Sequence, residues 1–289
     1  MKWTHGFAAV ALALLSACAH ERKVDAYLPI TRMELPEAGD RAFTGGVGSV
    51  GVARLRLTED QTAQAPDTTQ PDIQQGVGAL TRFDASPTPM LSLGARVYGK
   101  GGGGQVKLMP LQPALEGTRF ALAFTAGYSE SREDFDEDGE WFDFCFFWCE
   151  DEEDPTAHTH LRQRLVDYAA IVGVRIAPAW MVFGGPYRSH THYGGHHRSN
   201  GGPETQFAGE ATASGGNLGL AWTLGRWGRV IGEVSGADVR AHASRERVWM
   251  PSLAYQIDFG STLRPIVPER EEPVEVVPLE PVKRTDLSP

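Results

Sequence analysis

The sequence predicts an all-β fold: an antiparallel up-and-down β-barrel of about ten strands, with eight strands as the smaller alternative. Apolar and polar residues alternate with period two over runs of 8–13 residues, and the connections between these runs alternate between short and long. The alternation fills residues 45–260, which we expect to form the barrel domain. The flanking residues 18–44 and 261–289 are more polar and contain several prolines, and we expect them to be disordered tails.

Residues 164–176 give the clearest strand. The even-numbered positions from Val166 to Ile176 are all apolar, whereas the odd-numbered positions include Asp167 and Arg175. Similar alternation occurs within 119–129, 217–224 and 248–259. Ten strands are predicted, at about 46–58, 75–84, 90–99, 105–112, 118–131, 161–177, 180–193, 207–224, 229–241 and 247–259.

The connections predict how the two rims of the barrel differ. Short connections fall at 85–89, 113–117, 178–179 and 225–228, whereas 59–74, 100–104, 132–160 and 194–206 are longer or looser. The link at 242–246 is a short exception. An even number of strands returns both chain ends to the rim with the short turns.

The periodicity leaves open which face of each strand lies inside. In one arrangement the lumen holds small and charged side chains, including Arg54, Arg56, Arg82, Arg96, Arg175 and Glu233. In the other the apolar faces form the core of a soluble β-domain. Aromatic residues near the strand ends favour the first arrangement: Trp180, Trp222, Trp227 and Phe259 at the short-turn rim, and Tyr128 and Trp249 at the other. Residues 45–260 thereby resemble the small outer-membrane β-barrel class in general, which implies a barrel embedded in lipid.

The N-terminus predicts export. A lysine at position 2 precedes an apolar run from Phe7 to Leu15, which is too short to span a bilayer. The following Leu15-Ser16-Ala17-Cys18 resembles the lipobox of bacterial lipoproteins. That resemblance implies a signal peptide at 1–17, with diacylglycerol and an N-acyl chain such as palmitate on Cys18. Residues 18–44 would then be a lipidated tether, and alanine at position 19 favours transfer to the outer membrane.

Composition excludes some functions. The net charge of −10 argues against nucleic-acid binding, which requires a basic surface.

The cysteines predict a disulfide. With Cys18 lipidated, the remaining two of three cysteines are Cys145 and Cys149, which we expect to form a disulfide outside the cytoplasm. The tail at 261–289 is rich in proline and glutamate and is a candidate contact for an envelope protein or peptidoglycan.

The acidic connection at 132–160 is a candidate calcium site. Its Asp134, Asp136 and Asp138 alternate and are followed by glycine, in an order that resembles the start of a calcium loop. The twelfth position is Cys145, where an EF-hand has glutamate. A solvated acidic loop is the alternative interpretation.

Histidines predict a second candidate metal site. A tight hairpin through Pro178-Ala179 would place Asp167 opposite His190 on the lumen face, with His192 two residues further along. His158 and His160 would approach the same end. Imidazoles two apart on one strand can bind zinc, nickel or copper. A polar surface without metal is the alternative.

A catalytic hypothesis rests on His242-Ala243-Ser244. The spacing resembles the His-x-Ser pair of the outer-membrane lipid A deacylases, in which the histidine would activate the serine. Arg245 stands where that family has asparagine.

The sequence as a whole favours a non-enzymatic outer-membrane lipoprotein β-barrel with a structural or interaction role. Its surface loops would meet a partner or a cation, and its barrel would meet outer-membrane lipid. Two alternatives remain: a lipid-tethered soluble β-barrel that binds a small apolar ligand, and a lipid-modifying barrel enzyme.

Overall fold

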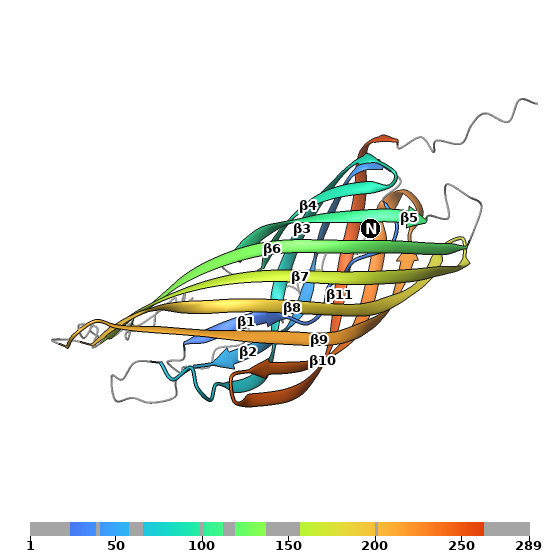
Figure 1. Ribbon diagram of the computed structural model, residues 1–289. Helices are drawn as coiled ribbons and strands as arrows, with labels where there is room; N and C mark the ends of the chain where they lie inside the picture. The colour runs from blue at the N-terminus through green and yellow to red at the C-terminus, as the bar shows by residue number, and fades with distance from the viewer. Residues whose placement is uncertain are drawn as a thin grey trace, which may run out of the picture.

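A computed structural model describes residues 24–38, 41–57, 66–98, 101–111, 119–136, 157–199 and 202–262. These residues form eleven strands and one 3-10 turn (Figure 1). The strands are β1 Asp25–Pro29, β2 Arg41–Arg56, β3 Asp72–Thr88, β4 Leu91–Tyr98, β5 Gly101–Leu111, β6 Phe120–Asp136, β7 Ala157–Ala177, β8 Trp180–Ser199, β9 Thr205–Thr223, β10 Arg229–Ala241 and β11 Ser244–Thr262, and the turn η1 is Gly225–Trp227. The described part of the chain has no helix long and apolar enough to cross a bilayer.

Strands β2–β11 form a closed antiparallel barrel. Each strand pairs with the next along the chain, and β2 closes the ring by pairing with β3 on one edge and β11 on the other. The predicted up-and-down barrel of ten strands is therefore confirmed. The observed ring runs from Arg41 to Thr262, slightly longer than the predicted 45–260, and the glycines from Gly101 to Gly104 belong to β5 where a loop was expected.

The connections separate two rims, which we name by position. The loop rim carries the connections at 57–71, 99–100, 137–156, 200–204 and 242–243, and the turn rim carries those at 89–90, 112–119, 178–179 and 224–228. Strands β6–β9 extend beyond their neighbours at the loop rim (Figure 1).

The large apolar side chains of the strands lie on the outside of the barrel. The exposed ones include Phe43, Val47, Phe83, Leu93, Val97, Val106, Leu108, Phe120, Phe124, Tyr168, Val172, Ile176, Leu218, Leu220, Val234, Leu253 and Ile257. A water-soluble domain would turn this set inward, because large apolar patches on its surface are unfavourable. The inward faces carry small, polar and charged residues, among them Arg82, Arg96 and Glu233, together with a buried apolar cluster that includes Leu165, Ile171 and Phe183.

Residues 24–38 lie inside the barrel, and we call them the plug. Its β1 pairs antiparallel with the loop-rim half of β2, from Asp25 opposite Arg56 to Pro29 opposite Val52. The side chains of Leu28 and Ile30 are fully buried in one apolar cluster with residues of the barrel wall such as Leu165. The sequence predicted a tether over 18–44. The structure differs because the alternating apolar residues of this segment have a lumen to pack into.

The direction of the plug follows from its contacts at both ends. Val24 accepts a hydrogen bond from the Leu57 amide at the loop rim, over 3.0 Å. Glu37 forms ion pairs at the turn rim, with Arg175 near the end of β7 and Arg229 at the start of β10. The plug therefore crosses the lumen from the loop rim to the turn rim, where β2 begins.

Candidate functional site

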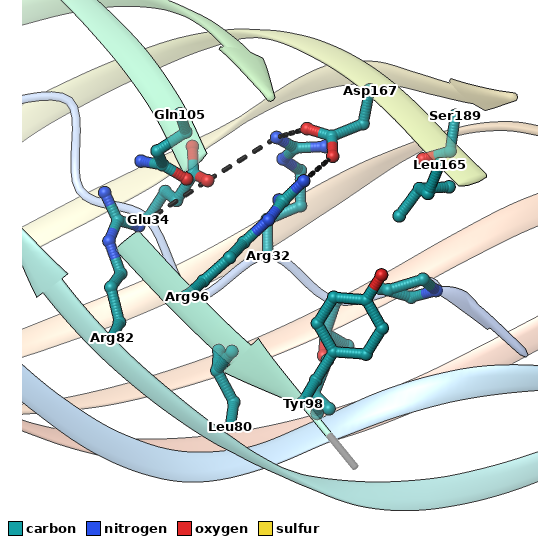
Figure 2. Close-up of a pocket in the computed structure, with 13 residues that line it drawn as sticks. Arg32, Glu34, Leu80, Arg82, Arg96, Tyr98, Gln105, Leu165, Asp167 and Ser189 are labelled. Carbon is teal, nitrogen blue, oxygen red and sulfur yellow. Dashed lines mark hydrogen bonds and ion pairs between the residues drawn. The ribbon is translucent and has the colours of Figure 1, made fainter. Parts of the chain in front are cut away.

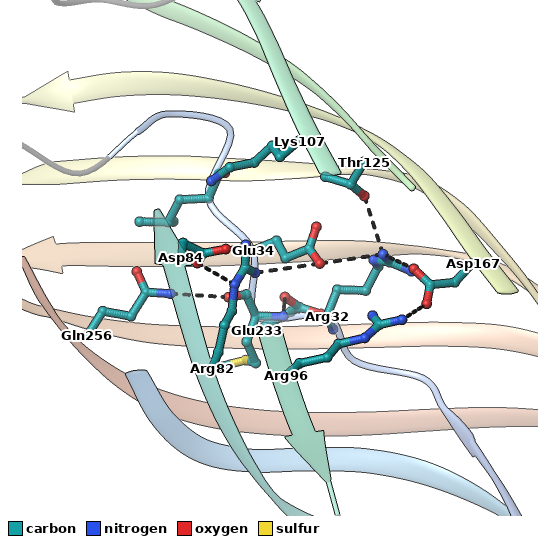
Figure 3. Close-up of polar contacts among 12 residues, drawn as sticks. Arg32, Glu34, Arg82, Asp84, Arg96, Lys107, Thr125, Asp167, Glu233 and Gln256 are labelled. Atoms are coloured by element: carbon teal, nitrogen blue, oxygen red, sulfur yellow. Dashed lines mark hydrogen bonds and ion pairs between the residues drawn. The ribbon is translucent and has the colours of Figure 1, made fainter. Parts of the chain in front are cut away.

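The second half of the plug carries charged side chains into a lumen whose wall is also charged. Figure 3 shows Arg32 and Glu34 of the plug among side chains that reach inward from β3, β4, β6, β7 and β10. The Arg82 guanidinium forms two ion pairs, one with the Glu34 carboxylate at 3.5 Å and one with the Asp84 carboxylate at 2.6 Å. The side chains of Arg32, Glu34 and Arg82 are all at least 95% buried, so water screens these ion pairs little.

Asp167 is the point where plug and wall join most directly. Its carboxylate accepts from Arg32 of the plug at 2.5 Å and from Arg96 of β4 on the other oxygen (Figure 2). Asp167 lies opposite Gly127 on β6, and a Cβ added at that glycine would come within 2.6 Å of the Arg96 guanidinium. The small residue thus leaves the room that the larger charged side chains occupy.

Glu233 holds the plug by its backbone. The amides of Arg32 and Met33 donate to its two carboxylate oxygens at 2.8 and 2.9 Å, and Ser235 donates to one of them. Met33 has a φ of 53°, in the left-handed region that non-glycine residues seldom adopt. Consecutive amides in such a conformation point at one anion, so this carboxylate stabilises the bend in the plug.

Cations hold the turn-rim end of the plug. Glu37 contacts Arg175 at 2.7 Å and Arg229 at 3.2 Å, and Arg229 also contacts Asp258 at 3.0 Å. The buried ammonium of Lys107 donates to the carbonyl oxygens of Leu35 and Glu37. Most of these groups come from different strands, so the plug links the strands of the wall to one another.

Charge is balanced within this network. Its six described cations are Arg32, Arg82, Arg96, Lys107, Arg175 and Arg229, and its six described carboxylates are Glu34, Glu37, Asp84, Asp167, Glu233 and Asp258. A cavity of about 20 Å³ remains beside Arg32 and Asp167, roughly enough for one water molecule. A second cavity, of about 10 Å³, lies beside Lys107 and Arg229, and each of the two is too small for a substrate or an apolar ligand.

The predicted pairing of Asp167 with His190 is wrong by one residue. Between Arg175 and Ala177 a β-bulge shifts the register of β7 on β8, so that His190 lies opposite Val166 and Asp167 opposite Ser189. A shift of one residue moves a side chain to the other face of a sheet. Asp167 therefore lies in the lumen, whereas His190 and His192 lie outside.

On the outer face His190 and His192 meet a residue that the sequence analysis did not name. Glu210 of β9 pairs directly with His192 of β8. Its carboxylate lies 3.9 Å from His190 Nε2 and 3.8 Å from His192 Nδ1, and the two histidine Nε2 atoms are 2.8 Å apart.

The other predicted ligands form separate contacts. His160 Nδ1 lies 2.5 Å from Asp134 on the exposed face of β6 and β7, and His158 lies two residues before it on the same strand. The candidate calcium site remains a prediction, because the side chain of Asp136 and residue Asp138 lie outside the described residues. Cys18, Cys145 and Cys149 lie outside them as well.

The predicted catalytic pair lies at the hairpin between β10 and β11. His242 occupies the two-residue turn with a φ of 47°, and Ser244 begins β11. Among the described residues no hydrogen bond joins their side chains, and the catalytic pair stays a prediction. Nearby, the Thr69 hydroxyl and amide donate to Asp67, which holds the pKa of that carboxyl below its ordinary value.

Comparisons with known proteins give a likeness of fold. No protein-family model and no curated protein matches the chain. Among solved structures it resembles Ail, the attachment invasion locus protein of Yersinia pestis, solved with the heparin analogue sucrose octasulfate; identity is 10% and the TM-score 0.33, over 74% of this chain and 97% of Ail. It also resembles the outer-membrane protease OmpT of Escherichia coli, with 9% identity and a TM-score of 0.35, over 75% of this chain and 90% of OmpT. At these scores the likeness carries no function across.

The Asp167 clamp yields a test of the network. Asp167→Asn removes the carboxylate between two buried guanidiniums, and we expect it to lower the free energy of unfolding by about 3–5 kcal/mol. Urea titration of the detergent-solubilised protein measures this.

Asp238→Asn is the matched control. Asp238 also joins two arginines, Arg240 and Arg245, but on the exposed face, and we expect unfolding indistinguishable from the unmodified protein. Equal effects of the two substitutions would show that the lumen network does not hold the barrel.

Proposed function

We propose that the chain is an outer-membrane lipoprotein whose barrel is embedded in lipid and sealed by its own plug, with a structural or interaction role and no transport activity. The observation that carries this proposal is the distribution of side chains: large apolar residues outside the barrel, paired charges inside it. A membrane barrel needs both, because lipid cannot solvate charge.

The height of the apolar band supports a lipid setting. On β6 the outward side chains run from Phe120 at the turn rim to Tyr128, and Glu130 and Arg132 follow. Eight residues at about 3.4 Å each, tilted by about 40°, rise roughly 21 Å, close to the 25 Å expected for such a band. Trp249 on β11 lies at the corresponding boundary and is 62% exposed. Beyond Trp249, toward the loop rim, outward-facing side chains form ion pairs, such as the pair between Asp238 and Arg245.

The sealed lumen supports a role other than transport. The plug runs from the end of β2 at the loop rim to the turn rim, and its charges are paired with those of the wall. Among the described residues, the groups open to partners are therefore the outward charged side chains near the loop rim. An interaction role would use these surfaces.

The path of the plug bears on the lipid anchor. Val24 enters the barrel at the loop rim, and Cys18 precedes it by six residues, which span about 21 Å at most. Long connections face the cell exterior in outer-membrane barrels. We therefore propose that the acyl chains of Cys18 lie in the outer leaflet. An even number of strands alone would favour the opposite side, where the short turns lie.

Fractionation tests whether the barrel is embedded. A Cys18→Ala variant, exported behind an ordinary signal peptide, should still sediment with outer membranes, resist a carbonate wash and migrate differently on gels after heating. Each result follows from contact between the outer apolar face and lipid. Recovery as soluble periplasmic protein would contradict the proposal.

Epitope tags test where the N-terminus lies. A tag after Ala19 should bind antibody on intact cells, as should a control tag between β8 and β9, whereas a tag after Pro289 should bind only after permeabilisation. An N-terminal tag that shares the behaviour of the C-terminal tag would contradict the assigned path.

A further inference from the structure

The outer face of β8 and β9 gathers two imidazoles and a carboxylate above the apolar band. His190 and His192 point to the same face because side chains two apart on a strand do so. Glu210 reaches that face from the residue directly opposite His192. Hydrogen bonds to β7 on one side and β9 on the other fix the backbone of β8 here. The three side chains therefore project from a rigid support.

The three side chains lie close enough together to reach one shared ion. One ligand atom from each of the three side chains lies within 4.8 Å of the other two. In a tetrahedral site with bonds of about 2.0–2.1 Å, ligand atoms lie about 3.3 Å apart. The Nε2 atoms of His190 and His192 are 2.8 Å apart, and the Glu210 carboxylate lies 3.9 Å from His190 Nε2. The 3.8 Å contact between Glu210 and His192 is made by Nδ1, so the His192 ring must turn for one of its nitrogens to face both partners. These side chains are exposed or half-buried, so their rotation can bring one ligand atom of each toward the tetrahedral separation.

The chemistry of the three groups selects the class of ion. Imidazole nitrogen suits zinc, copper and nickel, whereas calcium and magnesium prefer oxygen ligands alone. Two histidines and one glutamate also form a known zinc ligand set that leaves a fourth position open. The negative charge of Glu210 offsets part of the repulsion from Arg164, opposite His192, and Arg188, two residues before His190.

We propose that His190, His192 and Glu210 bind one divalent transition metal ion, with zinc as the representative, at the outer surface of the barrel. The fourth coordination position faces away from the sheet and is open to water or to a donor from another molecule. The site goes beyond the proposed function and does not depend on it, because its geometry belongs to the barrel whether or not lipid surrounds it.

Zinc titration of the full-length protein tests the site. The protein, purified without a polyhistidine tag and stripped by chelator, should bind one zinc ion in this site by calorimetry. The double variant His190→Ala/His192→Ala should weaken binding by about 100-fold or more, since loss of even an outer-shell partner costs 10–100-fold. Glu210→Gln should weaken it as well while heat-modifiable migration stays unchanged.

Two nearby histidines provide the matched control. His160 and His196 lie opposite each other on the same face, and each contacts a single carboxylate, Asp134 and Glu204 respectively. The variant His160→Ala/His196→Ala also removes two imidazoles from this outer face, one from β7 and one from β8, and should retain the site. Zinc binding that survives loss of His190 and His192, or that falls equally in the control, would overturn the assignment.

Discussion

Burial of charge inside a closed barrel is the constraint on which the rest of this structure depends. An unpaired ion in a medium of low dielectric constant is strongly unfavourable, so every inward-facing arginine requires a nearby carboxylate. The wall alone does not meet this requirement. Arg82 pairs with Glu34 of the plug as well as with Asp84 of the wall, and Glu37 of the plug pairs with both Arg175 and Arg229. The plug supplies these partners, and the barrel surrounds it.

The same constraint explains why the plug is fixed in register. Glu233 accepts two amides at the bend around Met33, and Asp167 accepts from Arg32. Moving the plug by one residue would break both sets of contacts at once. Its first half depends on packing, since Leu28 and Ile30 fill the apolar part of the lumen. A segment held by both kinds of interaction forms part of the folded barrel.

The ten strands of the ring could be predicted from the sequence because their period is local and long. The plug was missed because Pro29 and Pro36 with mixed charges suggested an irregular tether. A signal was nevertheless present: Val24, Ala26, Leu28 and Ile30 alternate with period two. The pairing of that short strand depends on a lumen that only the assembled barrel creates.

The histidine site shows a different limit of sequence reasoning. Counting back from the turn at Pro178-Ala179 gave a register that a single extra residue at the bulge then shifted. A bulge leaves no reliable mark in one sequence, yet it decides which face a side chain occupies. His190 consequently lies near Glu210 outside the barrel, and Asp167 forms ion pairs with Arg32 and Arg96 in the lumen.

Thiol accessibility at Leu28 tests most directly whether the plug fills the barrel. In a variant with all three native cysteines replaced, exported behind an ordinary signal peptide, Leu28→Cys should resist a water-soluble maleimide until the barrel is unfolded. Gln70→Cys, on the exposed approach to β3, should react in the folded protein. Equal reaction at both positions in the folded barrel would contradict the account, because residues 24–38 would then lie in an open lumen or outside it.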